Sequence, residues 1–358
     1  MKIRIGIADP DKRYLQRITN VFNEKYAGEL EVYSFSDFSG LLQALGTVRI
    51  DVVLASEAPD VDPSALPPRC GFAYLSETQS GRNSEGYEVI SKFQRIDLIY
   101  KQVLNIFSEK AVSVTGPLRE DDGCLTAAFS SPAGGTGTTT MAAAAAMRFA
   151  MMGRRTIYLG LDIFGRSDDF FTGEGTYTMS DVIFALKNRN ANLGLKLESC
   201  VRRDIHTGAY FYASPQLALD MAELTKDDIM TLIEELKASG KYDVLILDAP
   251  FGLEQERLDI LRRAEAVVMV SDGRVPANAK ITRAAQALAM KDRSSQLPEE
   301  KLAPKLHVIY NLFSQSMGKQ IDSIELKCLG VVPRYGGASV LQILSELSGM
   351  PLFDTILG

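Results

Sequence analysis

Hydrophobic positions in about the first 110 residues follow two periods, one typical of strands and one typical of helices. Short apolar runs between polar turns predict the strands Lys2–Ala8, Leu30–Phe35, Asp51–Ala55, Cys70–Leu75 and Val89–Ile90. Apolar residues spaced by three and four predict the helices Asp11–Lys25, a helix capped by Ser36 and running through Leu45, and Ile96–Phe107. Strands that alternate with helices imply a parallel sheet covered on both faces, so this region is predicted to be α/β.

Two stretches of this region lack a helical pattern. Glu57–Arg69 contains four prolines, which obstruct a third helix. Ser76–Gly86 is polar and contains glycine, so a fourth helix is expected to be short or absent.

A second α/β pattern follows a segment that is typical of a linker. Ser113–Gly123 contains glycine, proline and a cluster of charges, which predicts domains at 1–112 and 124–358 joined by a linker at 113–123. In the second domain a helix is expected at Thr139–Met151. The expected strands are Leu125–Phe129, Thr156–Leu161, Val244–Leu247, Val267–Val270, Val308–Asn311 and Leu329–Pro333.

Residues 130–140, between the first strand and the helix of this domain, read Ser-Ser-Pro-Ala-Gly-Gly-Thr-Gly-Thr-Thr-Thr. A glycine-rich turn between a strand and a helix is the setting in which backbone N–H groups bind phosphates, helped by the partial positive charge of the helix N-terminus. Such loops carry a lysine before the Ser/Thr, and here that position is Thr138. The loop is therefore predicted to hold a nucleotide but to hydrolyse it poorly.

Composition narrows the class of protein. The chain has 358 residues, of which 46% are hydrophobic and 23% charged, as in a soluble globular protein, and no apolar run suits a membrane span. Its four cysteines and two histidines show no metal or redox spacing. The net charge of −6 disfavours broad binding of nucleic acid. The local basic candidates are Arg202-Arg203 and Lys187/Arg189, which a solvated helix face explains more simply.

The first domain resembles the receiver domains of response regulators. Asp9 and Asp11 follow the first strand, where receivers keep acidic metal ligands, and Lys92 follows the fifth, where receivers keep a lysine. Ser56 stands where receivers have the phosphoacceptor aspartate, so phosphorylation there is not expected. The resemblance implies a degenerate receiver used for docking or dimerisation. A plain α/β domain with Asp9 and Asp11 as turn residues is an equal alternative to a residual metal site.

The second domain resembles the MinD/ParA ATPases. Ala133–Thr139 is similar to their deviant Walker A loop, with both lysine positions lost, to Ala133 and Thr138. Asp162 and Asp248 each follow an expected strand. Asp162 resembles the aspartate that lies near the attacking water and the metal in that family, and Asp248 resembles its Walker B aspartate. The resemblance implies a doubly wound P-loop fold that binds ATP and Mg²⁺, with Thr139, Asp162 and Asp248 at the metal and Asp162 as the candidate catalytic residue. It implies nucleotide contacts from Gly134, Gly135, Thr136, Gly137, Thr138, Thr139, Thr140, Asn311 and Pro333.

Each of these residues also has a purely structural alternative. The glycines could form a tight turn only, Thr139 could be a helix N-cap, and Asp162 and Asn311 could be turn residues at strand ends. Arg166, Arg274 and Lys280 lie near expected strand ends and are candidates to replace the lost cations.

A degenerate receiver followed by an eroded MinD/ParA-type domain resembles the TadZ/CpaE proteins of the tight-adherence (Flp) pilus. The resemblance implies a cytoplasmic, homodimeric localisation factor, at a cell pole or at the inner-membrane face through its partners, which include a secretion ATPase. Leu341–Gly358 has no lysine or arginine, so a direct membrane anchor of the MinD type is not expected. Nucleic acid is not expected as a partner either, because of the net charge of −6. The alternatives are a ParA-like partitioning ATPase that binds DNA non-specifically, a receiver-type signalling regulator, and an iron–sulfur reductase, for which no cysteine cluster is seen.

Overall fold

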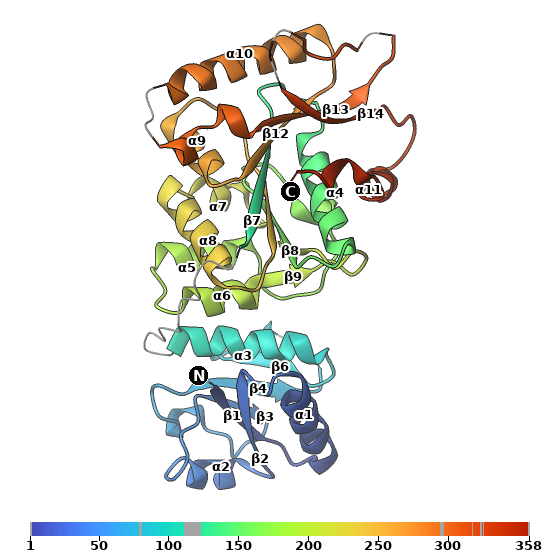
Figure 1. Ribbon diagram of the computed structural model, residues 1–358. Coiled ribbons are helices and arrows are strands. Elements are labelled where there is room, and N and C mark those ends of the chain that lie inside the picture. The colour runs from blue at the N-terminus through green and yellow to red at the C-terminus, as the bar shows by residue number, and fades with distance from the viewer. Residues whose placement is uncertain are drawn as a thin grey trace. The chain divides into compact units, whose positions relative to one another are not determined.

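The chain divides into two compact units in a computed structural model that describes residues 2–78, 81–110, 123–293, 297–316, 318–322, 324 and 326–356. Unit 1 comprises residues 1–118 together with Ala185–Cys200, and unit 2 comprises Arg119–Phe184 and Val201–Gly358. Both units are α/β, which confirms the predicted fold class (Figure 1). The expected linker at 113–123 lies outside the described residues except for Gly123. The domain limits 1–112 and 124–358 remain a prediction, and they place Ala185–Cys200 with the second domain rather than with unit 1.

Unit 1 is built on a six-stranded sheet of order β2-β1-β3-β4-β6-β5, in which only β5 runs antiparallel. The strands are β1 (Ile3–Ala8), β2 (Leu30–Phe35), β3 (Val52–Ser56), β4 (Gly71–Ser76), β5 (Gly81–Arg82) and β6 (Glu88–Ser91). The helices are α1 (Lys12–Lys25), α2 (Phe38–Ala44), α3 (Ile96–Lys110) and, from the later segment, α6 (Leu193–Cys200). Apolar residues of α1 and α3 form one core cluster with the sheet, and those of α2 belong to a second.

The prolines and polar stretches act in unit 1 as expected. Between β3 and β4 the only helical turn is the short 3-10 segment Pro63–Ala65. No helix is present between β4 and β6 in the described residues, where β5 pairs with β6 instead. The predicted cap of α2 was wrong by one residue, because Asp37 rather than Ser36 accepts the hydrogen bond from Gly40 N, at 2.7 Å.

Unit 2 is built on an eight-stranded sheet of order β14-β13-β12-β7-β11-β8-β10-β9. Its pairs are parallel except for β9 with β10. The strands are β7 (Leu125–Ser130), β8 (Thr156–Gly160), β9 (Val201–Arg203), β10 (Tyr210–Tyr212), β11 (Val244–Asp248), β12 (Ala266–Ser271), β13 (Leu306–Phe313) and β14 (Lys327–Pro333). The helices are α4 (Thr138–Met151), α5 (Met179–Lys187, which ends in unit 1), α7 (Ala218–Ala222), α8 (Lys226–Ala238), α9 (Gln255–Arg262), α10 (Val275–Asp292) and α11 (Val340–Ser348).

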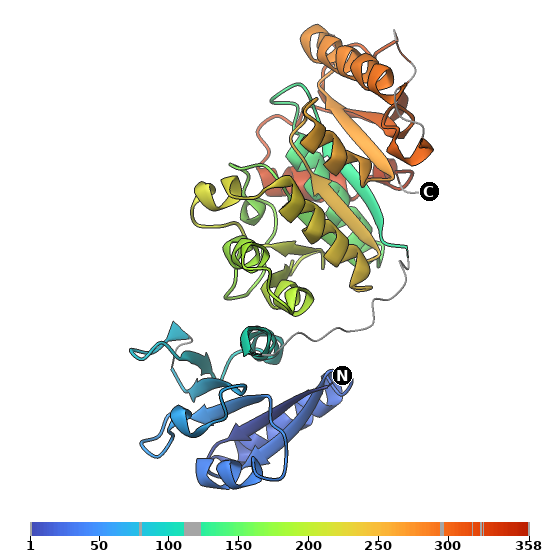
Figure 2. The same cartoon turned by 90° about the vertical axis from the view of Figure 1, so that its left-hand side faces the viewer.

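Helices cover both faces of this sheet, with α4 and α11 on one side and α8 and α9 on the other (Figures 1 and 2). Ala142–Ala146 of α4 are fully buried, because small side chains let the helix approach the centre of the sheet closely. The C-terminal residues belong to the same core: Leu344, Leu347 and Phe353 are buried with α4. Among the described residues, no helix is both long and apolar enough to cross a bilayer.

Candidate functional site

The glycine-rich loop turns sharply into the N-terminus of α4. Gly135 and Gly137 have φ angles of 75° and 79°, a region that side chains with a Cβ rarely adopt. Gly137 is the N-cap of α4, and because it has no side chain the first turn of the helix has no side-chain cap. The alternative of Thr139 as the N-cap is therefore wrong, because Thr139 lies inside the first turn and its hydroxyl is left for other contacts.

Hydroxyl groups hold the loop to its neighbouring strands. Ser130 Oγ donates to Ala249 O at 2.8 Å, next to the end of β11, and Ser131 Oγ donates to Val270 O of β12 at 2.7 Å. These contacts fix where the loop leaves the sheet. The sequence analysis missed both serines, since serine is common in such turns whatever it contacts.

Asn311 braces the loop from β13. Its side chain is 5% exposed, and its Nδ2 donates to Thr136 O at 2.9 Å. A Cβ at Gly137 would lie 2.3 Å from that nitrogen, so the loop needs glycine there for space as well as for φ. Asn311 is inside β13, and the alternative of a turn residue is wrong. Pro333 closes β14, where it pairs with Phe313. The nucleotide contacts of both residues stay a prediction.

Asp248 is a buried carboxylate at the end of β11, 5% exposed. Tyr158 of β8 donates its hydroxyl to Asp248 Oδ2 at 2.9 Å, and the Thr139 hydroxyl also bonds to this carboxyl. Burial raises the pKa of Asp248 to about 6, against the lowering effect of these two hydrogen bonds and with a further increase from Asp162. The structure thus brings Thr139, Asp248 and Asp162 to one edge of the sheet, and it adds Tyr158, which the sequence analysis did not single out.

Asp162 lies in the exposed loop that follows β8. Its Oδ1 accepts a hydrogen bond from Phe164 N at 3.0 Å, so it does shape a turn, and it also lines a pocket together with Asp248 and Arg166. Within the described ranges, no three His, Cys, Asp or Glu side chains form a metal-binding group. Mg²⁺ is commonly held by one or two carboxylates plus phosphate oxygens and water, so Thr139, Asp162 and Asp248 fit that donor set.

Of the three candidate replacement cations, the structure places only Arg166 in this pocket. Arg274 bonds instead to the Asp272 carboxylate, and Lys280 is exposed on α10. At the lost lysine positions, Ala133 is buried, and the hydroxyl of Thr138 lies 3.2 Å from that of Thr136.

The receiver-like residues of unit 1 are engaged with one another. Lys92 Nζ lies 2.6 Å from Asp9 Oδ2, with Asp9 fully buried and the Lys92 side chain 9% exposed. The Asp11 carboxylate caps α1 by accepting from Arg13 N and Tyr14 N. Ser56 is buried and donates to Ala8 O at 3.4 Å. Of the two alternatives left open for Asp9 and Asp11, these contacts favour the structural one.

Arg202, one of the basic residues considered for nucleic acid, does not lie on a helix face. Arg202 belongs to β9, and its guanidinium donates to Gly173 O at 3.4 Å and Tyr177 O at 3.2 Å. The expectation of a solvated helix face was therefore wrong for Arg202, because the strand turns its side chain toward backbone carbonyl groups.

Comparisons with known proteins agree with the two resemblances. Residues 1–108 match the family model of the TadZ-like receiver domain. The septum site-determining protein MinD of Escherichia coli K12 is 24% identical over 209 residues, which cover 56% of this chain and 74% of that protein. MinD of Bacillus subtilis is 21% identical, over 56% of this chain and 72% of the relative.

Among solved structures, MinD from Pyrococcus horikoshii OT3, complexed with Mg-ADP, is 18% identical with a TM-score of 0.49, covering 63% of this chain and 94% of that one. A ParA family ATPase from Chlorobium tepidum is 17% identical with a TM-score of 0.48, covering 65% and 97%. Residues 1–108 thus match the TadZ-like receiver domain, and the sequence also has a region that is similar to MinD.

Proposed function

We propose that this protein is a nucleotide-binding scaffold that binds ATP with Mg²⁺ and turns it over very slowly or not at all. One observation carries the proposal: a glycine-rich turn leads into the N-terminus of α4, whose Thr139 bonds to the buried Asp248 carboxyl, while both lysine positions hold neutral side chains. Backbone N–H groups and the helix N-terminus supply the attraction for phosphate. Thr139, Asp248 and Asp162 are the residues that would hold Mg²⁺, which neutralises phosphate charge when bound.

Slow turnover follows from the missing cations. Phosphoryl transfer depends on positive groups that neutralise the transferring oxygens, and the loss of such a cation costs about 10³-fold or more in rate. Arg166 is the only one of the candidate cations that lines the pocket beside Asp162 and Asp248, and it lies in an exposed loop. A protein that binds ATP without consuming it is suited to marking a place or holding a partner.

We infer from the TadZ-like receiver domain that the place is the assembly site of a tight-adherence pilus or a related secretion system. In this proposal the protein acts in the cytoplasm, at a cell pole or at the inner-membrane face through its partners, as a homodimer that recruits other assembly proteins, including a secretion ATPase. Arg202, a basic candidate for the DNA-partitioning alternative, is bonded to backbone carbonyls instead.

The test measures ATP binding by calorimetry and phosphate release on the same sample, with Mg²⁺ present. We expect binding with negligible release. Thr138→Lys restores the lysine position, and one charge-assisted contact of about 1.5–3 kcal/mol tightens binding roughly 10- to 150-fold. Met151→Lys adds the same charge at the far end of α4, where Met151 is 56% exposed, and should change neither quantity. Brisk release by the unmodified protein, or no heat with any adenine nucleotide, contradicts the proposal.

A further inference from the structure

Helix α3 of unit 1 is buried on more than the side that faces its sheet. Ile99, Val103 and Ile106 belong to the core cluster shared with the strands. The polar residues Asn105 and Ser108 are buried as well, at 1% and 3% exposure. The Ser108 hydroxyl is satisfied within the helix, since it donates to Asn105 O at 2.7 Å. The Asn105 side-chain oxygen needs a donor from a second polar surface, because an unsatisfied buried polar group costs about 1–3 kcal/mol.

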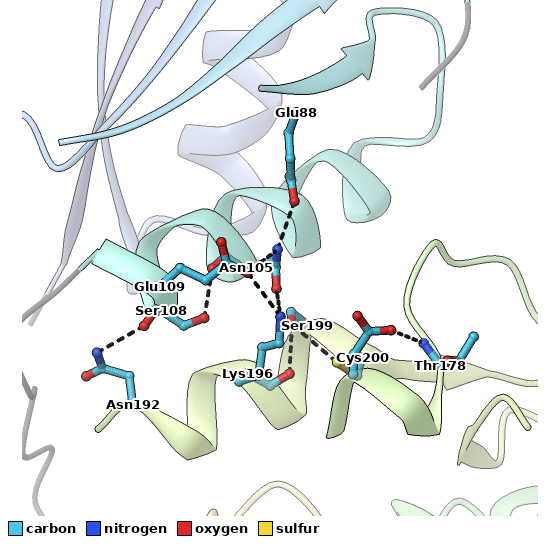
Figure 3. Close-up of polar contacts among 10 residues, drawn as sticks. Glu88, Asn105, Ser108, Glu109, Thr178, Asn192, Lys196, Ser199 and Cys200 are labelled. Carbon is cyan, nitrogen blue, oxygen red and sulfur yellow. Dashed lines mark hydrogen bonds and ion pairs between the residues drawn. The ribbon is translucent and has the colours of Figure 1, made fainter. Parts of the chain in front are cut away.

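Helix α6 supplies that surface within unit 1 (Figure 3). The ammonium of Lys196 donates to Asn105 Oδ1 and lies 3.4 Å from Glu109 Oε1. Asn105 in turn donates to Glu88 Oε1 at 3.0 Å. One turn earlier, Asn192 Nδ2 donates to Ser108 O at 3.4 Å. A single lysine thus joins a network that extends from α6 through α3 to β6.

Lys196 is an unusual residue for this position, since it is only 5% exposed. Taking an ammonium out of water costs several kcal/mol unless the site is built to receive it. The site is built: it offers an amide oxygen and a carboxylate, and a second carboxylate holds the amide in place. Apolar contacts accompany it, since Leu195 packs against the core of unit 1 and Leu197 is buried.

We propose that Ala185–Cys200 is a docking segment for the receiver-like unit, and that Lys196 is the residue by which α3 recognises it. In sequence the segment interrupts the MinD-like region, between β8 and β9, yet its contacts belong to unit 1. The α3 surface is consequently occupied by this chain's own helix rather than by a second copy. Charge and shape specify the occupant: a helix with one buried ammonium, flanked by apolar residues.

The test uses the full chain, with Cys200 as the reporter. This thiol is 1% exposed at the end of α6, whereas Cys328 is exposed and serves as the internal reference for the alkylating reagent. Lys196→Ala should raise the alkylation rate of Cys200 and the deuterium uptake of 193–200 about 100-fold, because removing one member of a buried pair leaves the other polar groups unsatisfied. Lys280→Ala removes an exposed lysine from α10 and should leave both rates unchanged.

Lys196→Met distinguishes the contribution of the ammonium from that of side-chain packing, since methionine keeps an unbranched apolar chain without the charge. It should also release Cys200, and β1, β3 and β11 should keep their wild-type protection, which shows that the chain is still folded. If Lys196→Ala also lowers the protection of β1, β3 and β11, that variant is not folded as the wild type is, and the proposal is judged on Lys196→Met alone. Wild-type protection of Cys200 in Lys196→Met, or an α6 that already exchanges freely in the unmodified protein, overturns the proposal.

Discussion

At the scale of single residues, Asp248 of the candidate site is a buried carboxyl whose ionised form is unfavourable. Its carboxylate is buried, and the hydroxyl groups of Tyr158 and Thr139 bond to it without cancelling the cost of burial. A site of this kind is destabilising in the free protein and ready to bind a cation. A carboxylate that stabilises the fold has a lowered pKa instead. The stability of the protein therefore changes with pH in opposite directions for the two kinds of carboxylate.

The folded-state pKa of Asp248, about 6, is above its unfolded value of 3.8, so the folded protein holds the proton more tightly. Stability contributed by this group is greatest below about pH 4 and is lost as the pH rises through 6, by about 3 kcal/mol. Without divalent cations, we expect Asp248→Asn to be more stable than the unmodified protein at pH 7, with the advantage gone at pH 4. Urea unfolding across this range measures the difference.

Asp243 is the control with the opposite sign. It is paired with Arg155, whose hydrogen bonds lower the pKa of the Asp243 carboxyl. Its stabilising contribution is present above the unfolded pKa and is lost as the pH falls. Asp243→Asn should therefore be less stable than the unmodified protein at pH 7. An Asp248→Asn variant that behaves like Asp243→Asn would show that Asp248 is a structural carboxylate.

Gly137→Ala tests how tightly Asn311 closes on the loop. The new Cβ would meet Asn311 Nδ2 at 2.3 Å, and φ is 79°, so the loop must shift. Gly153→Ala is the matched control, because Gly153 has a φ of 84° and nothing within 4 Å of its Cβ position. Both variants should lose about 1–2 kcal/mol of unfolding free energy from backbone strain. Only Gly137→Ala should weaken nucleotide binding, which calorimetry would measure, and equal binding by the two variants would contradict this role of Asn311.

Sequence reasoning found Asp248 but not Tyr158, and the reason is physical. A carboxylate at the end of an apolar strand is buried and therefore needs a partner. Its presence at that position in the sequence is enough to mark Asp248 as a candidate site residue. Tyr158 is one of 13 tyrosines, and nothing local distinguishes the one whose hydroxyl reaches Asp248. Lys196 was missed for the same reason, because its burial depends on α3, which lies about 90 residues earlier in the chain.

At the scale of elements, periodicity predicted the central strands and the helices α1, α3 and α4. It gave no prediction for α8, for the 18-residue α10 or for the short strands β9 and β10, and it missed the two-residue β5. In the part of the chain that the structure describes, β5 spans Gly81–Arg82, too short to show any alternation, and it pairs with the edge of β6. The prediction for α2 was wrong by one position, because Ser36 and Asp37 are both good caps and only backbone geometry selects between them.

The link between β1 and the end of β6 rests on the pair of Asp9 with Lys92. Lys92→Met would leave the fully buried Asp9 carboxylate without its cation and should cost about 3–5 kcal/mol of unfolding free energy. The double variant Asp9→Asn with Lys92→Met removes both charges and should recover much of the loss, as chemical denaturation would show. A Lys92→Met variant as stable as the unmodified protein would show that the pair has no net structural role.

At the scale of the whole molecule, the docking segment is covalently continuous with a helix that lines the pocket of Asp162 and Asp248. Helix α5, which leads into the segment, begins at Met179, a residue that lines the pocket with Asp162 and Asp248. Directly after the segment, Arg202 of β9 bonds to Gly173 O and Tyr177 O. The sequence predicted two domains in succession. It contained no sign that the chain returns to the first unit, since a short amphipathic helix looks the same whichever core it covers.

This continuity predicts that nucleotide binding and docking of α6 are linked. If ATP with Mg²⁺ changes the free energy of docking, linkage requires that undocking change the affinity for ATP by the same factor, typically 5- to 150-fold. We expect ATP to change the alkylation rate of Cys200, and Lys196→Met to change ATP affinity in calorimetry by the reciprocal factor. ADP and Mg²⁺ alone serve as controls for occupancy of the pocket. Tight ATP binding that leaves Cys200 unaffected, with equal affinities in the two proteins, would show that the segment attaches unit 1 without sensing the nucleotide.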